Sequence, residues 1–217
     1  MIECTLGSAA RPLRRILCLG AHCDDIEIGC GGTILRLLRD NPNCEIHWQV
    51  FSSSAVRKRE ALRGADMFLK SARARTVVVR SFKDGYFPSL HAQIKNEFEK
   101  LKTKFQPDLI LTHYRHDLHQ DHRIICELTW NTFRDHLILE YEIPKYDGDL
   151  GAPNFFVQLD RDTCERKAKY IYDSFASQQK KQWFTTDVFL SLHRLRGIES
   201  NAQTKYAEAF HCRKAVA

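Results

Sequence analysis

The sequence predicts an open α/β fold built on a largely parallel sheet. Short apolar runs alternate along the chain with longer amphipathic segments, as strands alternate with helices in such folds. Several of the short runs are apolar throughout, which is typical of parallel strands that are buried on both faces. No internal repeat or low-complexity linker divides the chain, so we expect one domain over residues 1–217, with a less regular part from about residue 137.

The expected elements follow from these runs and from the residues that bound them. The run 15–21 ends in small residues and predicts the first buried strand. Gly31 and Gly32 then precede a helix that we expect over 33–39, before Asn41 and Pro42. Ser89 is expected to cap a long helix that runs to about Phe105. The other expected strands are 45–51, 76–79, 109–112, 137–143 and 155–159, and the other expected helices are 55–69, 121–134, 161–175 and 186–196.

Composition and charge narrow the class of protein. No apolar stretch precedes the basic residues near the start of the chain, and none is long enough to span a membrane, so we expect a cytoplasmic protein. The eight cysteines are scattered without a CxxC pair, and several stand in apolar runs, which predicts reduced thiols. The net charge of +6 is compatible with an anionic substrate, and no nucleic-acid-binding motif is present. We therefore expect a small-molecule partner, no nucleic acid and no membrane, and leave a homo-oligomer open.

Two polar clusters stand at the carboxyl ends of expected strands. The residues 22–25, His-Cys-Asp-Asp, follow the first strand, and a segment rich in His and Asp, 113–122, follows the strand 109–112. Because ligands bind at the carboxyl ends of strands in open α/β sheets, the two clusters are expected to meet in one crevice.

The residue types in these clusters predict a metal-dependent hydrolase. Zinc accepts histidine nitrogen and aspartate oxygen, and catalytic zinc sites use three protein ligands and leave one position open. His22, Asp25 and one histidine of the segment 119–122 would supply such a set. Asp24 would then be free to take a proton from water, as the hydrolysis of an acyl bond requires.

At this point the sequence resembles a known family. The stretch AHCDDIEIGCGGT is similar to AHPDDxExGxGGT, the signature of the PIG-L (LmbE-like) N-acetylglucosaminyl deacetylases. From His113 onward, the segment that ends HDLHQDH resembles the family's second motif, HxxDxHxDH. Arg57 with Glu60, Asp84 with Gly85, and the C-terminal RG and YAEAF stretches resemble further family elements. The resemblance extends over most of the chain and is weakest between about 141 and 187.

The resemblance implies a fold, a cofactor and a role for each matched residue. The fold would be a Rossmann-like three-layer sandwich, and the cofactor one zinc ion per chain, with another divalent metal possible. The implied roles are metal ligation by His22, Asp25 and His122; general-base catalysis by Asp24; oxyanion stabilisation or protonation of the leaving amine by His119; orientation of a catalytic histidine by Asp121; and contacts to sugar hydroxyls or an attached anionic group by Arg57 and Asp84.

Two positions depart from the family pattern. Cys23 stands where the family has proline, and we interpret it as a loop residue rather than a fourth ligand. Tyr114 is the nearest counterpart of a tyrosine that some members carry near the second motif.

Three functions remain open. The expected activity is removal of an N-acetyl group from an acetamido sugar or sugar conjugate. The alternatives are an amidase that cleaves a larger amide in a thiol or antibiotic glycoconjugate, and a nucleotide- or sugar-binding module without turnover, which the glycines after Asp25 would suit.

Overall fold

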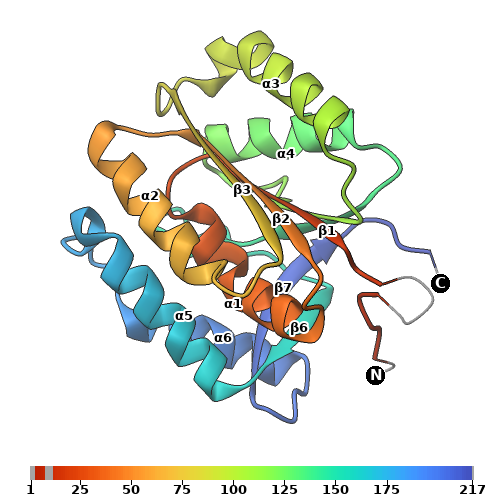
Figure 1. Ribbon diagram of the computed structural model, residues 1–217. Coiled ribbons are helices and arrows are strands. Elements are labelled where there is room, and N and C mark those ends of the chain that lie inside the picture. Colours follow the sequence, from red (N-terminus) through yellow and green to blue (C-terminus); the bar gives the residue numbers. More distant parts are fainter. Residues whose placement is uncertain (1–2, 8–11, 217) are drawn as a thin grey trace.

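The computed structural model describes residues 3–7 and 12–216, and it places a seven-stranded sheet between two layers of helices (Figure 1). In chain order the elements are β1 (Arg15–Gly20), α1 (Asp25–Asp40), β2 (Glu45–Ser52), α2 (Ala55–Phe68), β3 (Ala74–Phe82), η1 (Phe87–Leu90), α3 (His91–Lys104), β4 (Leu109–His113), α4 (Gln120–Thr132), β5 (Leu137–Tyr141), β6 (Phe155–Leu159), α5 (Arg161–Ser174), η2 (Ala176–Gln178), α6 (Thr186–Glu199) and β7 (Tyr206–Cys212).

The sheet is largely parallel, as the sequence predicts. Its strand order is β3-β2-β1-β4-β5-β7-β6. The pairs from β3 through β5 are all parallel, whereas β7 runs antiparallel to both β5 and β6. The predicted α/β three-layer sandwich is therefore confirmed. The order reverses at β1, which lies between β2 and β4, and this is the position where open sheets of this kind form a crevice.

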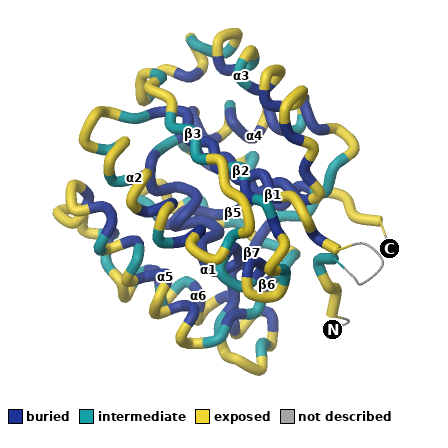
Figure 2. Tube along the Cα trace, in the orientation of Figure 1, coloured by how far each residue is buried: buried dark blue, intermediate teal, exposed yellow. Residues whose placement is uncertain are grey.

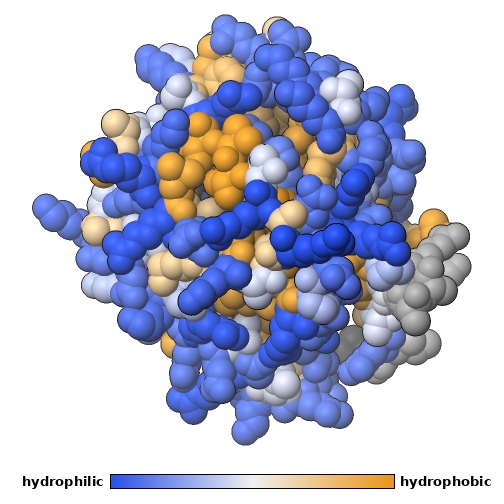
Figure 3. All heavy atoms as spheres, in the orientation of Figure 1, coloured by the Kyte–Doolittle hydropathy of each residue, from blue (hydrophilic) through white to orange (hydrophobic). Residues whose placement is uncertain are grey.

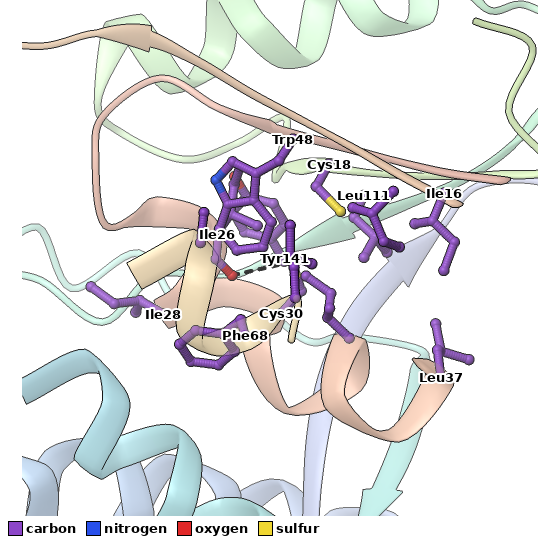
Figure 4. Packing of buried hydrophobic residues seen from close by; sticks show 14 of the residues in the cluster. Ile16, Cys18, Ile26, Ile28, Cys30, Leu37, Trp48, Phe68, Leu111 and Tyr141 are labelled. Carbon is purple, nitrogen blue, oxygen red and sulfur yellow. Dashed lines mark hydrogen bonds between the residues drawn. The ribbon is translucent and has the colours of Figure 1, made fainter. Parts of the chain in front are cut away.

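Two apolar clusters fill the space on the two sides of the sheet. Helices α3 and α4 cover one face, and α1, α2, α5 and α6 cover the other (Figure 1). Helix α1 is the most deeply buried, lying between the sheet and α5 (Figure 2). Trp48 of β2 and Phe68 of α2 pack beside Ile26 and Cys30 of α1 (Figure 4). Six of the eight cysteines are buried and all eight, each within the described residues, are free thiols, as predicted.

Helix α1 begins eight residues earlier than the sequence suggests, at Asp25 rather than at Thr33. The glycines between these positions lie inside the helix, at places where large side chains come so close to its backbone that a Cβ atom would not fit. A Cβ atom added to Gly29 would lie 2.1 Å from the Tyr141 ring, and one added to Gly31 would lie 2.5 Å from Phe68. These glycines therefore permit close packing of a helix and do not form a phosphate-binding loop.

Two other expectations differ from the structure. Ser89 lies inside η1 and does not cap α3, which begins at His91 without a side-chain cap. The sequence does not indicate strand β7, because a glutamate, Glu208, interrupts its apolar residues and is buried in an ion pair with Lys167. The molecular face seen in Figure 3 is mainly hydrophilic, with an apolar area between α3 and the edge strand β3. No helix among the described residues is long and apolar enough to cross a membrane.

Candidate active site

The two polar clusters meet because β1 and β4 are neighbours in the sheet and run in the same direction. His22 follows β1 and His122 lies in the first turn of α4, which follows β4. Their ring nitrogens, His22 Nδ1 and His122 Nε2, are 3.1 Å apart although the residues are separated by 100 positions. The carboxyl end of β3 brings Asp84 to the same place, with its carboxylate 3.0 Å from His22 Nε2.

His22, Asp25 and His122 form a group that fits a divalent metal ion. Besides the 3.1 Å between the two rings, Asp25 lies 3.4 Å from His22 Nδ1 and 3.6 Å from His122 Nε2. Ligand atoms bound at about 2.0–2.1 Å to a tetrahedral ion lie about 3.3 Å from one another. The donor types and their separations thus match a site of this kind.

Two carboxylates hold the far side of the His22 ring. Its Nε2 faces Asp84 at 3.0 Å and Asp121 at 3.3 Å, so the proton is assigned to Nε2 and the lone pair of Nδ1 faces Asp25 and His122. Burial opposes a charge on this ring, but Asp25, Asp121 and Asp84 together raise the pKa of His22 well above its usual value. Without a bound cation a second proton therefore occupies Nδ1, and a metal ion would displace that proton and take up the lone pair. Asp121 is itself buried, and it accepts hydrogen bonds from the backbone N–H groups of Gly85 and Phe87. Asp121 therefore orients His22 and anchors the loop that carries Asp84.

Asp117 holds His122 in the same manner, although sequence analysis assigns it no role. His122 Nδ1 donates to Asp117 Oδ2 over 2.9 Å, which leaves Nε2 facing His22 and Asp25. Burial, followed by the proximity of His113, lowers the pKa of His122 to about 3, so this ring is neutral and ready to bind a cation. The only sequence signal for Asp117 is its place within the second motif, five residues before His122.

The loop after β5 supports Asp117 in turn. Lys145 lies 3.1 Å from Asp117 Oδ2 and also binds both carboxylate oxygens of Asp149. Asp149 accepts a hydrogen bond from the N–H of Leu118, next to Asp117. Both Lys145 and Asp149 come from the part of the chain where the family resemblance is weakest, so sequence analysis misses them.

Asp25 is surrounded by histidines. Its carboxylate accepts a hydrogen bond from the backbone N–H of His22 at 2.6 Å and lies 3.2 Å from the ring nitrogen His113 Nε2. Burial favours the neutral acid, yet His122, His113 and His22 hold the pKa of Asp25 well below its usual range. His113 also accepts a hydrogen bond from the backbone N–H of Ala21 and stacks on His122, so it packs against the ligand cluster and supports it. His116, by contrast, is exposed.

Asp24 points to a different neighbour than Asp25 does. Its carboxylate forms an ion pair with Arg57 at 2.7 Å, and Arg57 also contacts Glu60 at 3.1 Å and lies over the ring of Phe175. Arg57 is thus engaged within the protein. Cys23 turns away from the cluster and donates to the backbone carbonyl of Ser52, in agreement with its interpretation as a loop residue.

His119 stands at the edge of the ligand cluster and caps α4. Its Nδ1 accepts from the N–H of Asp121, and its ring lies edge-on to His22, with centroids 4.8 Å apart. Burial, together with the proximity of His22, lowers the pKa of His119. Tyr114 instead stacks on His211, with ring centroids 3.7 Å apart.

Comparison with known proteins identifies the family. The family model described as PIG-L, GlcNAc-PI de-N-acetylase, matches residues 17–133, more than half of the chain. The chain belongs to the PIG-L family. The matched PIG-L region contains all eight residues for which the resemblance implies a role.

Solved structures share the fold of this PIG-L protein at low sequence identity. The conserved protein TT1542 from Thermus thermophilus is 17% identical, with a TM-score of 0.71 over 93% of this chain and 95% of that chain. N,N'-diacetylchitobiose deacetylase from Pyrococcus horikoshii is 18% identical, with a TM-score of 0.67 over 92% and 84%. GalB, the 4-carboxy-2-hydroxymuconate hydratase from Pseudomonas putida, is 14% identical, with a TM-score of 0.66 over 94% and 98%. Because a hydratase shares this fold, the activity of the PIG-L chain has to be argued from its site.

Proposed function

We propose that this protein is a zinc-dependent hydrolase that removes an N-acetyl group from an acetamido sugar or sugar conjugate. The observation that carries the proposal is the convergence of His22, Asp25 and His122 at ligand spacing, with a second carboxylate, Asp24, next to Asp25 in the sequence. Membership of the PIG-L family supports an amide of an amino sugar as the substrate. We infer that one catalytic domain spans residues 1–217, because strands from both halves of the chain share one sheet.

His22, His122 and Asp25 would hold the metal, and the neighbouring carboxylates orient the two rings for this. Asp121 and Asp84 hold the proton of His22 on Nε2, and Asp117 holds the proton of His122 on Nδ1, so that one lone pair from each ring is directed inward. A divalent metal bound there supplies Lewis acidity, which polarises the amide carbonyl and lowers the pKa of water to about 7.

Asp24 is the general base in this proposal. It takes the proton from the water that attacks the acetyl carbonyl, and the ion pair with Arg57 directs the carboxylate. Its position next to Asp25 in sequence, but against α2 in space, separates the group that handles the proton from the group that binds the metal.

His119 acts on the oxyanion or on the leaving amine in this proposal. With Nδ1 engaged by the backbone of Asp121, only Nε2 is left to stabilise the developing oxyanion or to give a proton to the leaving amine. Asp84, whose side chain is 72% exposed, keeps one face open to sugar hydroxyls while it contacts His22.

An acetate-release screen over free and nucleotide-linked N-acetylhexosamines, with and without chelator, tests this proposal. We expect release from at least one N-acetyl sugar, its loss on chelation and its return with zinc. Mass spectrometry of the released acid identifies an amidase for larger amides if an acid other than acetate appears. Equal hydrolysis by chelated and untreated protein contradicts the role of the metal, and tight sugar binding without any released acid supports a binding module.

A further inference from the structure

The outer face of α4 carries two hollows that the proposed reaction does not use. They have volumes of about 420 and about 430 Å³, and Glu127 and Trp130 line both of them. The first reaches the loop before α4 through Arg115 and His116, and the second reaches the segment after β7 through Arg213 and Lys214. The two hollows adjoin at these shared residues, and we call them together the α4 groove.

Positive charge gathers along the α4 groove. Its lining includes the cationic residues Arg115, Arg123, Arg134, Arg213 and Lys214. Within the part of the chain that the structure describes, the last four of these form no ion pair, and Arg115 approaches only Glu140, at 3.9 Å. By contrast, exposed arginines on α1 and β3, such as Arg39 and Arg75, contact aspartates at 2.8 and 2.6 Å.

The cations in the groove are held in place by other contacts. Arg123 donates from Nη1 to the carbonyls of Asp117 and Leu118, at 2.9 and 2.6 Å. Arg213 lies over the Trp130 ring, with its guanidinium carbon 4.2 Å from the ring centroid, and the indole N–H of Trp130 donates to Glu140. The aromatic ring and the guanidinium groups are therefore partly fixed before any ligand arrives, which lowers the entropy cost of binding.

The groove lies on a different face of α4 from the metal-ligand cluster. Asp121 and His122 are buried on the inner side of the helix, whereas Arg123, Glu127 and Arg134 are exposed on the outer side. A molecule in the groove would thus occupy a place separate from the proposed acetamido site.

We propose that the α4 groove is a second binding site, which takes a small molecule that carries phosphate groups. Guanidinium forks match phosphate oxygens in geometry and charge, and Trp130, Ile124 and Pro88 add an apolar wall for the rest of the ligand. Arg134, Arg213 and Lys214 line the same hollow, so their positive charges converge on one part of the groove, where a phosphate group would bind. Glu127 lines both hollows, and its carboxylate disfavours a continuous polyanion such as a nucleic-acid strand.

Direct binding measurements test this site without any need for turnover, so their outcome is independent of the proposed deacetylation. Pyrophosphate is titrated calorimetrically into the wild-type protein, into Arg134→Glu with Arg213→Glu, and into the charge-matched control Arg161→Glu with Lys169→Glu on α5. Arg161 and Lys169 are highly exposed, at 73% and 71% of their side chains. We expect the groove variant to bind at least about tenfold more weakly than both other proteins, because two charge-assisted contacts are lost.

A second arm separates a soluble phosphate from a lipid headgroup as the source of the ligand. Phosphatidylcholine vesicles with and without phosphatidic acid are sedimented with the same three proteins. Groove-dependent binding of pyrophosphate assigns a soluble ligand, and groove-dependent sedimentation with phosphatidic acid alone assigns a headgroup. If neither probe binds, or if the groove variant binds as the wild type does, the proposal is wrong; an anion held at the metal cluster gives the latter result.

Discussion

Two buried clusters of charged and imidazole groups lie against α1, and they differ in how their polar atoms are used. At the start of the helix, His22, Asp25 and His122 direct lone pairs toward one another. In the middle of the helix, Lys167 donates to the Ile28 carbonyl at 2.6 Å, to His193 at 2.9 Å and to Glu208 at 2.6 Å.

The second cluster pairs its charged atoms with one another, and among its described side-chain atoms His193 Nδ1 alone lacks a hydrogen-bond partner. Glu208 accepts hydrogen bonds from the N–H groups of Gly32 and Thr33 in addition to the one from Lys167. Burial and Lys167 hold the pKa of His193 well below its usual value, so this neutral ring accepts a hydrogen bond that Lys167 donates. The residue types alone therefore do not mark a functional site. Lone pairs that face one another call for a cation, whereas a lysine and a glutamate that are already paired with each other hold helices together.

The largest expected effect concerns stability and the closed cluster. Lys167→Met leaves Glu208 buried without its cation, and we expect a loss of about 3–5 kcal/mol in the free energy of unfolding, measured by urea denaturation. The double variant Lys167→Met with Glu208→Gln should recover much of this loss. His22→Ala, in the open cluster, should cost less, about 1–2 kcal/mol in metal-free protein, because Asp25 keeps its histidine neighbours and Asp121 keeps its two backbone N–H partners. Equal losses for Lys167→Met and His22→Ala would remove the distinction between the clusters.

The next effect concerns metal affinity. Asp117→Asn keeps the shape of the side chain but not its charge, so His122 loses the partner that fixes its inward lone pair. We expect zinc to bind about 10–100-fold more weakly, as measured by competition with a chelating dye, with the fold retained. Asp135→Asn, at a residue whose side chain is 91% exposed, is the matched control. Unchanged zinc affinity in Asp117→Asn would mean that Asp117 is only structural.

The smallest effect separates two roles for Arg57. Because Arg57 forms an ion pair with Asp24, Arg57→Met should misplace the base and lower kcat about tenfold or more, with little change in KM. Arg59→Met, an exposed neighbour on α2, should behave as the wild type. A higher KM with unchanged kcat would instead assign Arg57 to the substrate, as the family resemblance implies.

The sequence predicts the sheet and the position of the site better than it predicts the contacts within the site. Continuous apolar runs place β1 and β4 as buried parallel strands, and from this the meeting of His22 and His122 follows. The sequence pattern places the start of α1 too late. The glycines of this helix are explained by the close packing of Tyr141 and Phe68, which are distant in sequence and so do not appear in a local pattern.

Ion-pair partners that come from distant segments of the chain could not be predicted from the sequence either. Strand β7 escapes sequence analysis because the partner that permits a buried glutamate in it, Lys167, is 41 residues away. The support of Asp117 by Lys145 depends on how the loop after β5 packs against the loop before α4. The ion pair of Asp24 with Arg57 depends on how α2 packs beside α1. Residue spacing identifies candidates for a site, but only the fold shows which atoms face each other.

The paired variants Asp24→Asn and Asp25→Asn test the central claim most directly, with zinc content and acetate release measured on the same samples. We expect Asp25→Asn to lose both zinc and activity. Asp24→Asn should retain zinc at the wild-type level while acetate release falls by about 100-fold or more, as expected for removal of a general base. Loss of zinc from Asp24→Asn, or full activity in either variant, would contradict the division of roles between the two adjacent aspartates.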